Sequence, residues 1–372
     1  MSSLITKITG VRLPGKPHSS RWDISIAGDG TVASVDAHEG HQPTSPSQQS
    51  TLEAQDRLLT PSLCHAHIHL DKCFLLQDPK YADLQIEQGD FKEAMSLTTE
   101  AKSRFAEDDL LRRGRQLIEE SISYGVTAMR AFVEVDSGVN FKCLDVGLAL
   151  KREFAERCHV QLCAFAQLPL FSGEDGGTEI RTLMEKAMEN EDVEVVGSTP
   201  YVEDDEDREN KNVEWIVGQA LSKKKFLDLH LDYHLDESKK PMVHEVIKQL
   251  KVHGWKDQGG KAITLGHCTR LTMLSKDEWQ QLKESIEDLP ISFVGLPTSD
   301  LFMMRTESLV RGTLHIPQII NEYGLQAAIA VNNVGNAFTP QGNCDPLSIA
   351  QLGVGLYQAG TKEDANLLFV SI

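Results

Sequence analysis

Eight short runs of apolar and β-branched residues recur along the chain and alternate with segments of helical periodicity. The runs span residues 63–70, 126–135, 160–168, 193–200, 226–232, 262–268, 291–297 and 325–333. Buried strands of a parallel sheet read as nearly continuous apolar runs, and their alternation with helices is typical of βα units. Eight such units predict an α/β fold, a (β/α)8 TIM barrel.

The segments between the runs have the periodicity of amphipathic helices. Within residues 107–125, apolar and small residues recur on one helical face, and Gly125 is expected to end the helix. Near the end of the chain, Thr361 and Asp364 have the spacing of a capping box, which predicts the start of another helix.

The N-terminal part of the chain has a different pattern. Residues 3–13 and 22–37 contain short stretches of strand-forming residues that are separated by turn residues. The sequence Gly28-Asp29-Gly30 indicates a hairpin between two of these strands. A small β-sheet appendage is therefore predicted before the barrel.

A linker is expected to connect this appendage to the barrel. Residues 38–55 are rich in Ser, Gln and Pro and offer little to bury, so we expect an exposed loop with His38 and His41 in solvent. The predicted domains are a small β-strand appendage with its linker over residues 1–60 and the barrel over residues 61–372.

Composition narrows the class of partner. The 372-residue chain has a net charge of −18, whereas nucleic acid or an anionic membrane would require a basic surface. No apolar stretch is long enough to span a membrane, no signal-peptide core is present, and the seven cysteines contain no CxxC pair. We expect a cytoplasmic protein with a small-molecule substrate, and homo-oligomer formation is left open. The acidic residues 201–212 are expected to form a solvated loop.

Side chains with metal-binding or catalytic chemistry lie where the predicted strands end. Because such barrels have their active sites at the C-terminal ends of the strands, these side chains should meet. His67 and His69 alternate along the first strand and therefore face the same side. The other strand-end residues are Glu134, Gln167, His230, His267, Asp300, Asn332 and Asn333. A single histidine in such a place is more often structural, but four that converge indicate a metal site.

This arrangement and its surrounding motifs resemble the amidohydrolase superfamily, most closely its cytosine deaminase and N-isopropylammelide amidohydrolase branch. The motifs are "HIHLDK" at 67–72, "GVTAMRAFVEVD" at 125–136, "AFAQ" at 164–167, "DLHLD" at 228–232, "LGHCTR" at 265–270, "LPTSDL" at 296–301 and "NNVGNAFTPQGNCDPL" at 332–347. Order and spacing agree over almost the whole chain. The resemblance implies a metal-dependent enzyme that acts on a C–N bond of a small heterocycle or amide.

The resemblance implies one divalent metal ion. By position, His67, His69 and His230 would be its ligands, and Asn332 stands where the family has a ligand aspartate. No lysine ends the fourth strand, at residues 193–200, so a carbamylated lysine that bridges two metals is not expected. A divalent metal polarises the group under attack and lowers the pKa of its water to around 7. Zinc is favoured, and iron is an alternative because imidazole suits both.

The resemblance also implies roles for other strand-end residues. His267 would polarise the attacking water or the substrate, and Gln167 matches the residue that reads the substrate amide. We expect Lys72 and Asn333 to contribute to substrate binding. Lys72 and Asp71 follow the histidine pair and could also orient it through hydrogen bonds.

Two positions depart from the family. Asn332 replaces the ligand aspartate, and Tyr233 stands where cytosine deaminase has the glutamate that shuttles the proton. A carboxamide binds a metal more weakly than a carboxylate and cannot take a proton from water at neutral pH. Asp300 and Tyr233 are the favoured replacements as proton carrier. The other acidic candidates are Glu134, Asp232 and Asp236.

Three functions remain open at this stage. The leading hypothesis is a metal-dependent hydrolase with altered catalytic residues. The alternatives are a metal-dependent lyase, isomerase or cyclase that needs no delivered water, and a catalytically inactive scaffold. Family members usually continue with strands that complete the N-terminal sheet, so we expect a truncated chain, a reduced sheet or a partner that covers the sheet edge.

Overall fold

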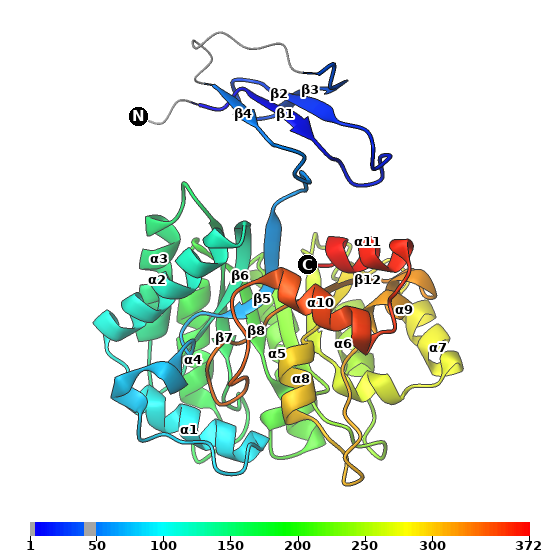
Figure 1. The fold of residues 1–372 in the computed structure, drawn as a ribbon. Helices are drawn as coiled ribbons and strands as arrows, with labels where there is room; N and C mark the ends of the chain where they lie inside the picture. The colour runs from blue at the N-terminus through cyan, green and yellow to red at the C-terminus, as the bar shows by residue number, and fades with distance from the viewer. Residues whose placement is uncertain (1–3, 41–49) are drawn as a thin grey trace. The chain divides into compact units, whose positions relative to one another are not determined.

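The computed structural model describes residues 4–40 and 50–372 and divides the chain into two compact units, residues 1–62 and 63–372 (Figure 1). The first unit contains a sheet of four strands and the second a sheet of eight. All of the predicted site residues belong to the second unit.

The first unit is a sheet with the strand order β3-β2-β1-β4. Its strands are β1 (Lys7–Val11), β2 (Trp22–Ile26), β3 (Val32–Ala37) and β4 (Thr51–Glu53). β1 and β3 each pair antiparallel with β2, whereas β4 runs parallel to β1. The predicted hairpin is confirmed: Gly30 has a φ of 85° in the β2–β3 turn, a left-handed conformation that suits glycine.

The exposed loop predicted for residues 38–55 is wrong in part. Thr51–Glu53 forms a strand because its backbone pairs with β1, and composition carries no signal of that pairing. His38 is half-buried rather than solvated, with its Nδ1 2.8 Å from Asp23 Oδ1. Residues 41–49, including His41, lie outside the described residues.

The second unit is a barrel of parallel strands, each next to its neighbour in the chain. The strands are β5 (Leu63–His69), β6 (Val126–Glu134), β7 (His159–Ala166), β8 (Val193–Ser198), β9 (Phe226–Leu231), β10 (Ile263–His267), β11 (Ile291–Gly295) and β12 (Gln326–Ile329). Just past β12, Asn332 closes the ring by pairing with Ile68, and its carbonyl accepts from the His69 N–H at 2.8 Å. The eight predicted strands and the (β/α)8 fold are confirmed.

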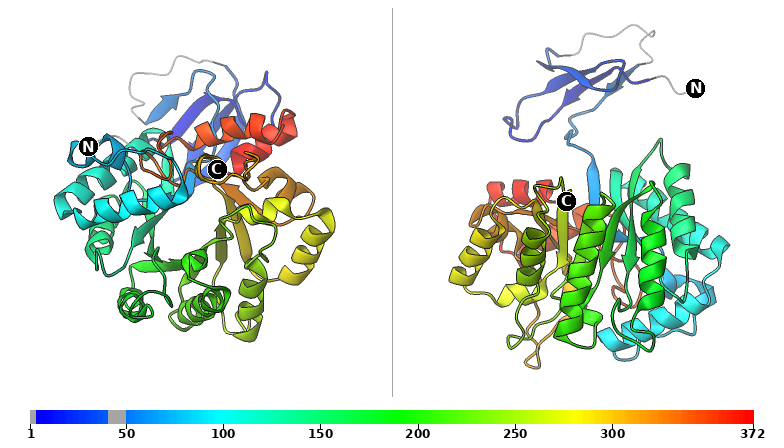
Figure 2. Two further views of the ribbon diagram at one scale, coloured as in Figure 1. Left: turned by 90° about the horizontal axis from the view of Figure 1, so that it is seen from below. Right: turned by 180° about the vertical axis from the view of Figure 1, so that it is seen from behind.

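Helices surround the strands, as the view along the barrel shows (Figure 2). The α-helices are α1 (Phe91–Ser103), α2 (Glu107–Ser123), α3 (Lys142–Glu153), α4 (Thr178–Met188), α5 (Glu206–Ser222), α6 (Val243–Val252), α7 (Lys276–Ile286), α8 (Pro297–Met303), α9 (Ile316–Asn321), α10 (Pro346–Leu356) and α11 (Lys362–Val370). Short 3₁₀ turns are η1 (Leu75–Gln77), η2 (Pro79–Tyr81), η3 (Pro200–Val202) and η4 (Thr269–Met273). No helix in the described ranges is long and apolar enough to cross a bilayer.

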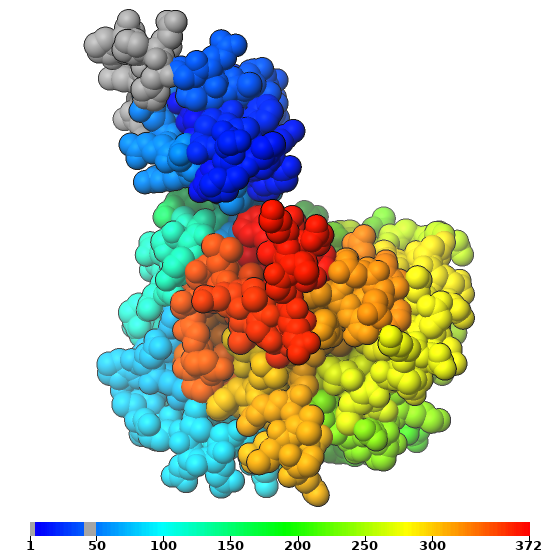
Figure 3. Space-filling view, turned by 45° about the vertical axis from the view of Figure 1, so that its right-hand side comes forward, coloured from blue at the N-terminus to red at the C-terminus, as the bar shows by residue number. Residues whose placement is uncertain are grey.

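The two helix predictions at α2 and α11 are confirmed. Gly125, with a φ of 89°, follows the end of α2. Thr361 caps α11, and its hydroxyl accepts from the Asp364 N–H at 3.1 Å. In the space-filling view α10 and α11 lie on the outer surface of the barrel unit, where α11 also contacts α9 (Figure 3).

The solvated loop predicted for residues 201–212 is wrong in part. Its second half is the first turns of α5, with Asp205 at the N-cap accepting from the Arg208 N–H at 2.9 Å. Acidic side chains suit this position because the N-terminus of a helix carries partial positive charge. Glu203 is buried and accepts from Leu170 N at 2.7 Å. The acidic residues therefore help to order this segment, although residues 204–207 are exposed.

Candidate functional site

Three histidines converge inside the barrel at the C-terminal ends of the strands. His67 and His69 lie on β5 and His230 on β9, and all three are buried. The Nε2 atom of His230 lies 3.1 Å from Nε2 of His67 and 3.1 Å from Nε2 of His69. The structure therefore brings the three predicted imidazole ligands to one point.

Two aromatic rings form the floor beneath these histidines. The ring centroids of Phe132 and His67 are 4.0 Å apart, and those of Phe165 and His230 are 4.2 Å apart. Both phenylalanines are fully buried on neighbouring strands, β6 and β7. This packing fixes the ring planes and keeps water away from the lower side of the site.

The histidine cluster fits a divalent metal ion. Burial lowers the pKa of His67, His69 and His230 well below the ordinary value, so the rings are neutral at neutral pH and each carries a lone pair. One N–H on His230 Nε2 could satisfy only one of its two nitrogen neighbours. A cation held by all three Nε2 atoms satisfies both contacts, and imidazoles bind zinc at about 2.0–2.1 Å.

Asn332 offers an oxygen at the same site. It follows β12 with a φ of 68°, and its Nδ2 donates to Ser299 Oγ at 2.7 Å. Its Oδ1 is buried and has no hydrogen-bond partner among the described residues. An unpaired buried carbonyl oxygen is costly unless something binds it, and a cation would do so.

His67 and His69 are distinguished from a nearby histidine on the same strand. The β5–β6 register is irregular between His65 and Ile68. His65 Nε2 lies 3.1 Å from Ser121 Oγ on the outer helix α2, so this ring faces away from the cluster. The irregularity explains why three alternate histidines do not share one face.

His267 stands beside the cluster with its orientation fixed by Asp300. His267 Nδ1 lies 2.7 Å from Asp300 Oδ1, and Thr313 Oγ1 donates to Asp300 Oδ2 at 2.6 Å. His267 has a φ of 64°, a strained conformation for a non-glycine residue of the kind found at functional sites. Asp300 is fully buried behind His267 and does not line the cavity.

Tyr233 packs against His267 on its other side. The two ring centroids are 3.8 Å apart, and the Tyr233 hydroxyl donates to the Ser299 carbonyl at 3.3 Å. Burial and the nearby Asp300 raise the pKa of Tyr233 well above its ordinary value. The phenol therefore stays protonated at neutral pH.

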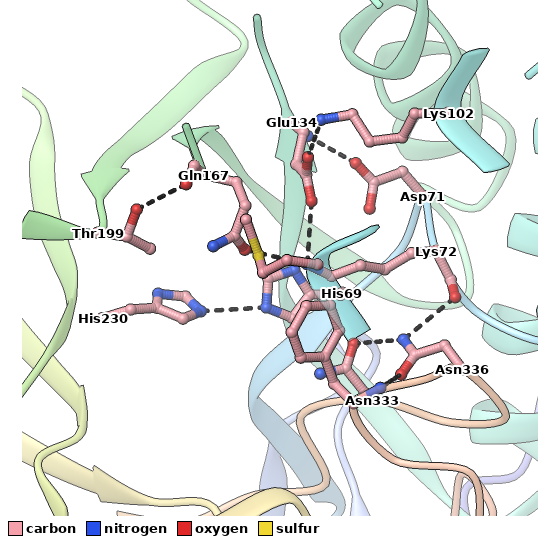
Figure 4. Close-up of polar contacts among 12 residues, drawn as sticks. His69, Asp71, Lys72, Lys102, Glu134, Gln167, Thr199, His230, Asn333 and Asn336 are labelled. Carbon is pink, nitrogen blue, oxygen red and sulfur yellow. Dashed lines mark hydrogen bonds and ion pairs between the residues drawn. The ribbon is translucent and has the colours of Figure 1, made fainter. Parts of the chain in front are cut away.

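Lys72 connects the cavity to a buried group of charges (Figure 4). Its Nζ donates to Glu134 Oε1 at 2.9 Å and to Gln167 Oε1 at 3.2 Å. The other oxygen of Glu134 accepts from Lys102, which also pairs with Asp136. Glu134 is therefore held as a carboxylate between two lysines and is not free to carry protons.

The remaining acidic candidates, Asp232 and Asp236, lie outside the cavity, and so does Asp71, which was predicted to orient the histidine pair. Asp232 accepts from the N–H groups of Met242 and Val243 and thus caps the start of α6. Asp236 is exposed and accepts from Ser238. Asp71 accepts from the Glu134 N–H at 2.6 Å. None of the three lines the cavity next to the histidines.

A small, partly open cavity is lined by His69, His230 and His267. Its volume is about 10 Å³, which is room for about one water molecule. The lining contains eight of the predicted site residues: His69, Lys72, Gln167, His230, Tyr233, His267, Asn332 and Asn333. A larger cavity of about 790 Å³, lined by Arg130 among others, opens at the opposite ends of the strands, where such barrels carry no active site.

Sequence reasoning missed the aromatic residues that cover the cavity. Phe91, Tyr201 and Phe338 line it together with Tyr233, and the Phe91 ring lies 5.8 Å from the rings of both Tyr233 and Phe338. Phe91 begins α1, Tyr201 lies in η3, and Phe338 lies in the segment after β12. Phe338 lies within the motif at 332–347 that carries the resemblance, but no role was assigned to it, and Phe91 and Tyr201 lie outside the motifs.

No protein-family model matches the chain. Among curated proteins, N-isopropylammelide isopropyl amidohydrolase of Pseudomonas sp. (strain ADP) is 24% identical over 362 residues, which is 95% of this chain and 81% of that protein. Among solved structures, 5-methylcytosine deaminase from Klebsiella pneumoniae, liganded with 5-fluorocytosine, has a TM-score of 0.84 at 22% identity, covering 98% of this chain and 84% of that one.

The predicted resemblance to the cytosine deaminase-like branch of the amidohydrolase superfamily is confirmed. A second solved relative, N-isopropylammelide isopropylaminohydrolase from Burkholderia multivorans ATCC 17616, has a TM-score of 0.75 at 18% identity and covers 98% of this chain and 84% of that one. The amidohydrolase fold thus extends over both units of the chain.

Proposed function

We propose that this amidohydrolase-like chain is a metal-dependent hydrolase that acts on a C–N bond of a small heterocycle or amide, with one divalent metal ion held by His67, His69 and His230. The observation that carries the proposal is the convergence of the three buried Nε2 atoms beside His267. The names of the relatives, an amidohydrolase and a deaminase, support the same bond type.

The metal would supply electrophilic activation of the bond and acidification of a water molecule. Asn332 Oδ1, the unpaired buried oxygen, would be its fourth protein contact. All four of these protein donors are neutral, whereas the family's aspartate is charged. A centre without a carboxylate ligand keeps the full charge of the ion and acidifies bound groups more strongly.

His267 is the residue of this chain best arranged to move the proton. Asp300 accepts from His267 Nδ1–H, which leaves Nε2 as the acceptor on a ring that lines the cavity. Nε2 would take a proton from water and deliver it to the leaving nitrogen, while Asp300 stabilises the imidazolium. Asp300 is then a positioning residue, and the buried Tyr233 phenol packs on the ring and holds it in place.

Turnover in oxygen-18 water tests the proposal. Small cyclic amides and amino-substituted heterocycles would be offered to the metal-loaded protein, and products would be analysed by mass spectrometry together with released ammonia or amine. We expect one labelled oxygen in the product for each nitrogen released. Product without the label and without released nitrogen would show that the reaction is not hydrolysis.

A metal-dependent lyase or isomerase is the second candidate. The observation in its favour is that the cavity lining contains no carboxylate, so the usual proton carriers of the family's hydrolysis are absent from it. Such an enzyme would give unlabelled product in the same experiment. A scaffold without turnover would bind no metal, so metal analysis of the purified protein separates it from both enzymes.

A further inference from the structure

Lys72 is the only charged side chain besides histidine among the residues that line the cavity. The chain carries 55 acidic residues and a net charge of −18, yet no carboxylate of residues 4–40 or 50–372 reaches this lining. A substrate bound next to the histidines therefore meets a positive group at closest range, and the interaction between charges weakens with distance.

The Gln167 amide is oriented by this lysine. The ammonium group of Lys72 can only donate, so the Gln167 atom that lies 3.2 Å from it must be the carbonyl oxygen. The amide nitrogen is then the group that Gln167 offers elsewhere. Tyr201 lies beside Gln167 in the lining of the same cavity.

The Asn333 amide is oriented by a similar argument (Figure 4). Asn336 Oδ1 accepts from the backbone N–H groups of Phe338 and Thr339, each at 3.0 Å, so Asn336 Nδ2 is assigned without ambiguity. That nitrogen donates to Asn333 Oδ1 at 2.7 Å and to the Lys72 carbonyl at 3.2 Å. The Asn333 oxygen is thereby occupied, and its Nδ2 is the group left for the cavity.

We propose that Lys72, Gln167 and Asn333 form a donor wall that selects a substrate with one negative charge, carried on an ionised oxygen of a planar heterocycle or on a carboxylate. In all three side chains the acceptor atoms are absent or already bonded to the protein. A neutral heterocycle usually presents both donors and acceptors along one ring edge, and its donors would find no acceptor on this wall. An anion presents acceptors only, so the wall favours it. This inference rests on the proposed function only in taking the cavity as the substrate site.

The charges behind the wall hold Lys72 in place. Glu134 is shared between Lys72 and Lys102, and Lys102 is shared with Asp136. The two lysines and these two carboxylates balance in formal charge, so the wall favours an anion through its converging N–H donors and not through a net positive charge. Two of the three Lys72 donors are used, and the third N–H has no protein partner in the part of the chain that the structure describes.

Binding requires the aromatic cover of the cavity to move. The free volume of about 10 Å³ is too small for a heterocycle. The Phe338 ring lies 5.0 Å from Lys72 Nζ, over the ammonium group, and is the side chain that a ligand on the donor wall would displace. An anion would replace this cation–π contact with a charge-assisted hydrogen bond, which is the stronger interaction.

Barbiturate and uracil are suitable probes because the rings are similar in size but barbiturate is an anion at neutral pH and uracil is neutral. Calorimetric titration of the metal-loaded protein should give a dissociation constant for barbiturate at least about tenfold lower than for uracil. The same comparison on protein treated with a chelator isolates the donor wall from the metal, and the preference should remain.

Three variants test the assignment of the wall. Lys72→Met should remove the preference for barbiturate. Asn333→Asp turns a donor into an acceptor at nearly constant shape, so it should weaken the affinity for barbiturate at least about tenfold and leave the affinity for uracil unchanged. Lys248→Met changes an exposed lysine on α6 and should leave both affinities unchanged. Asn333→Asp keeps the test valid if Lys72→Met fails to fold.

The proposal is overturned if barbiturate does not bind, if uracil binds as tightly, or if Asn333→Asp folds and binds barbiturate normally. These outcomes are independent of turnover. A barbiturate preference with no hydrolysis in labelled water would sink the proposed function and leave the anion site standing. Hydrolysis of neutral amides alone, without a preference for the anion, would support the proposed function and overturn the anion site.

Discussion

Single residues decide which chemistry this barrel can perform. Asn332 and Tyr233 stand where the resemblance leads us to expect carboxylates, and His267 Nδ1 lies 2.7 Å from Oδ1 of the buried Asp300. Under the proposed function, the carboxylate of Asp300 would act through His267 and not from the cavity lining. At Asn332, replacing the amide nitrogen with oxygen would restore the carboxylate that the resemblance leads us to expect.

Asn332→Asp should raise both the affinity for zinc and the rate of hydrolysis. The new carboxylate replaces a neutral oxygen that is buried beside three neutral imidazoles, so we expect roughly tenfold tighter zinc binding. Competition with a chelating dye measures the affinity without relying on activity. Asn366→Asp, on the exposed side of α11, is the matched control. Unchanged zinc affinity in Asn332→Asp would mean that this side chain does not reach the metal.

Glu134 should make the fold sensitive to acid. Burial alone would raise its pKa, but Lys102 and Lys72 lower it to about 2 from an ordinary value of 4.5. A depressed carboxyl pKa stabilises the folded state above the unfolded value, and this contribution is lost as the pH falls from about 4.5 toward 2. Urea unfolding across this range should show a free energy of unfolding that decreases with falling pH.

Glu134→Gln should remove much of that pH dependence. At neutral pH the variant leaves two buried lysines with one partner fewer, which should cost about 3 kcal/mol or more of unfolding free energy. Glu153→Gln, at an exposed pair with Arg115, should change stability by less than about 0.5 kcal/mol. An equal acid sensitivity in wild type and Glu134→Gln would assign the effect to other carboxyls.

At the scale of elements, close strand contacts shape the barrel around the site. Gly197 on β8 has no side chain because the neighbouring strand comes too near: a Cβ there would lie 2.1 Å from the carbonyl oxygen of Asp228 on β9. His230 follows two residues later on β9. Moving these strands apart would therefore also move a proposed metal ligand.

Gly197→Ala and Gly218→Ala should have opposite effects. Gly197→Ala forces the backbones of β8 and β9 apart and should destabilise the protein by about 2–3 kcal/mol or more. The second lies in α5, where a Cβ would lie 3.4 Å from the nearest atom, of the His253 ring, and alanine should stabilise the helix by up to about 1 kcal/mol. Denaturant titrations of both variants measure the difference. A neutral Gly197→Ala would contradict the close β8–β9 approach.

At the scale of the whole molecule, metal binding should couple to folding. A ligand that binds only the folded state at about 100 to 1,000 times its dissociation constant adds roughly 3–4 kcal/mol. Zinc should therefore raise the Tm of chelator-treated protein by roughly 5–10 °C. His230→Ala should abolish the shift, and His234→Ala, at a half-buried ring outside the cluster, should retain it. A shift that survives in His230→Ala would place the zinc elsewhere.

Sequence alone determined the order of the strands and the identity of the chemical groups. The eight apolar runs are the eight barrel strands because strands covered on both faces must be apolar throughout. The barrel topology then brings strand-end residues together, which is why His67, His69 and His230 could be predicted as neighbours. The acidic segment before α5 was misread because charge pattern does not separate a helix N-terminus from a loop.

Only the tertiary structure decided how these groups are paired. The contact of Asp300 with His267, the sharing of Glu134 by two lysines, and the orientation of the Asn333 amide each join segments that lie far apart in the chain or depend on a hydrogen-bond network. Such pairings follow from packing and from the need to satisfy buried polar atoms, and neither leaves a periodic trace in sequence. The residues of the candidate site could thus be predicted from the sequence. The sequence could not predict which of them donate a hydrogen bond, which accept one and which hold another residue in place.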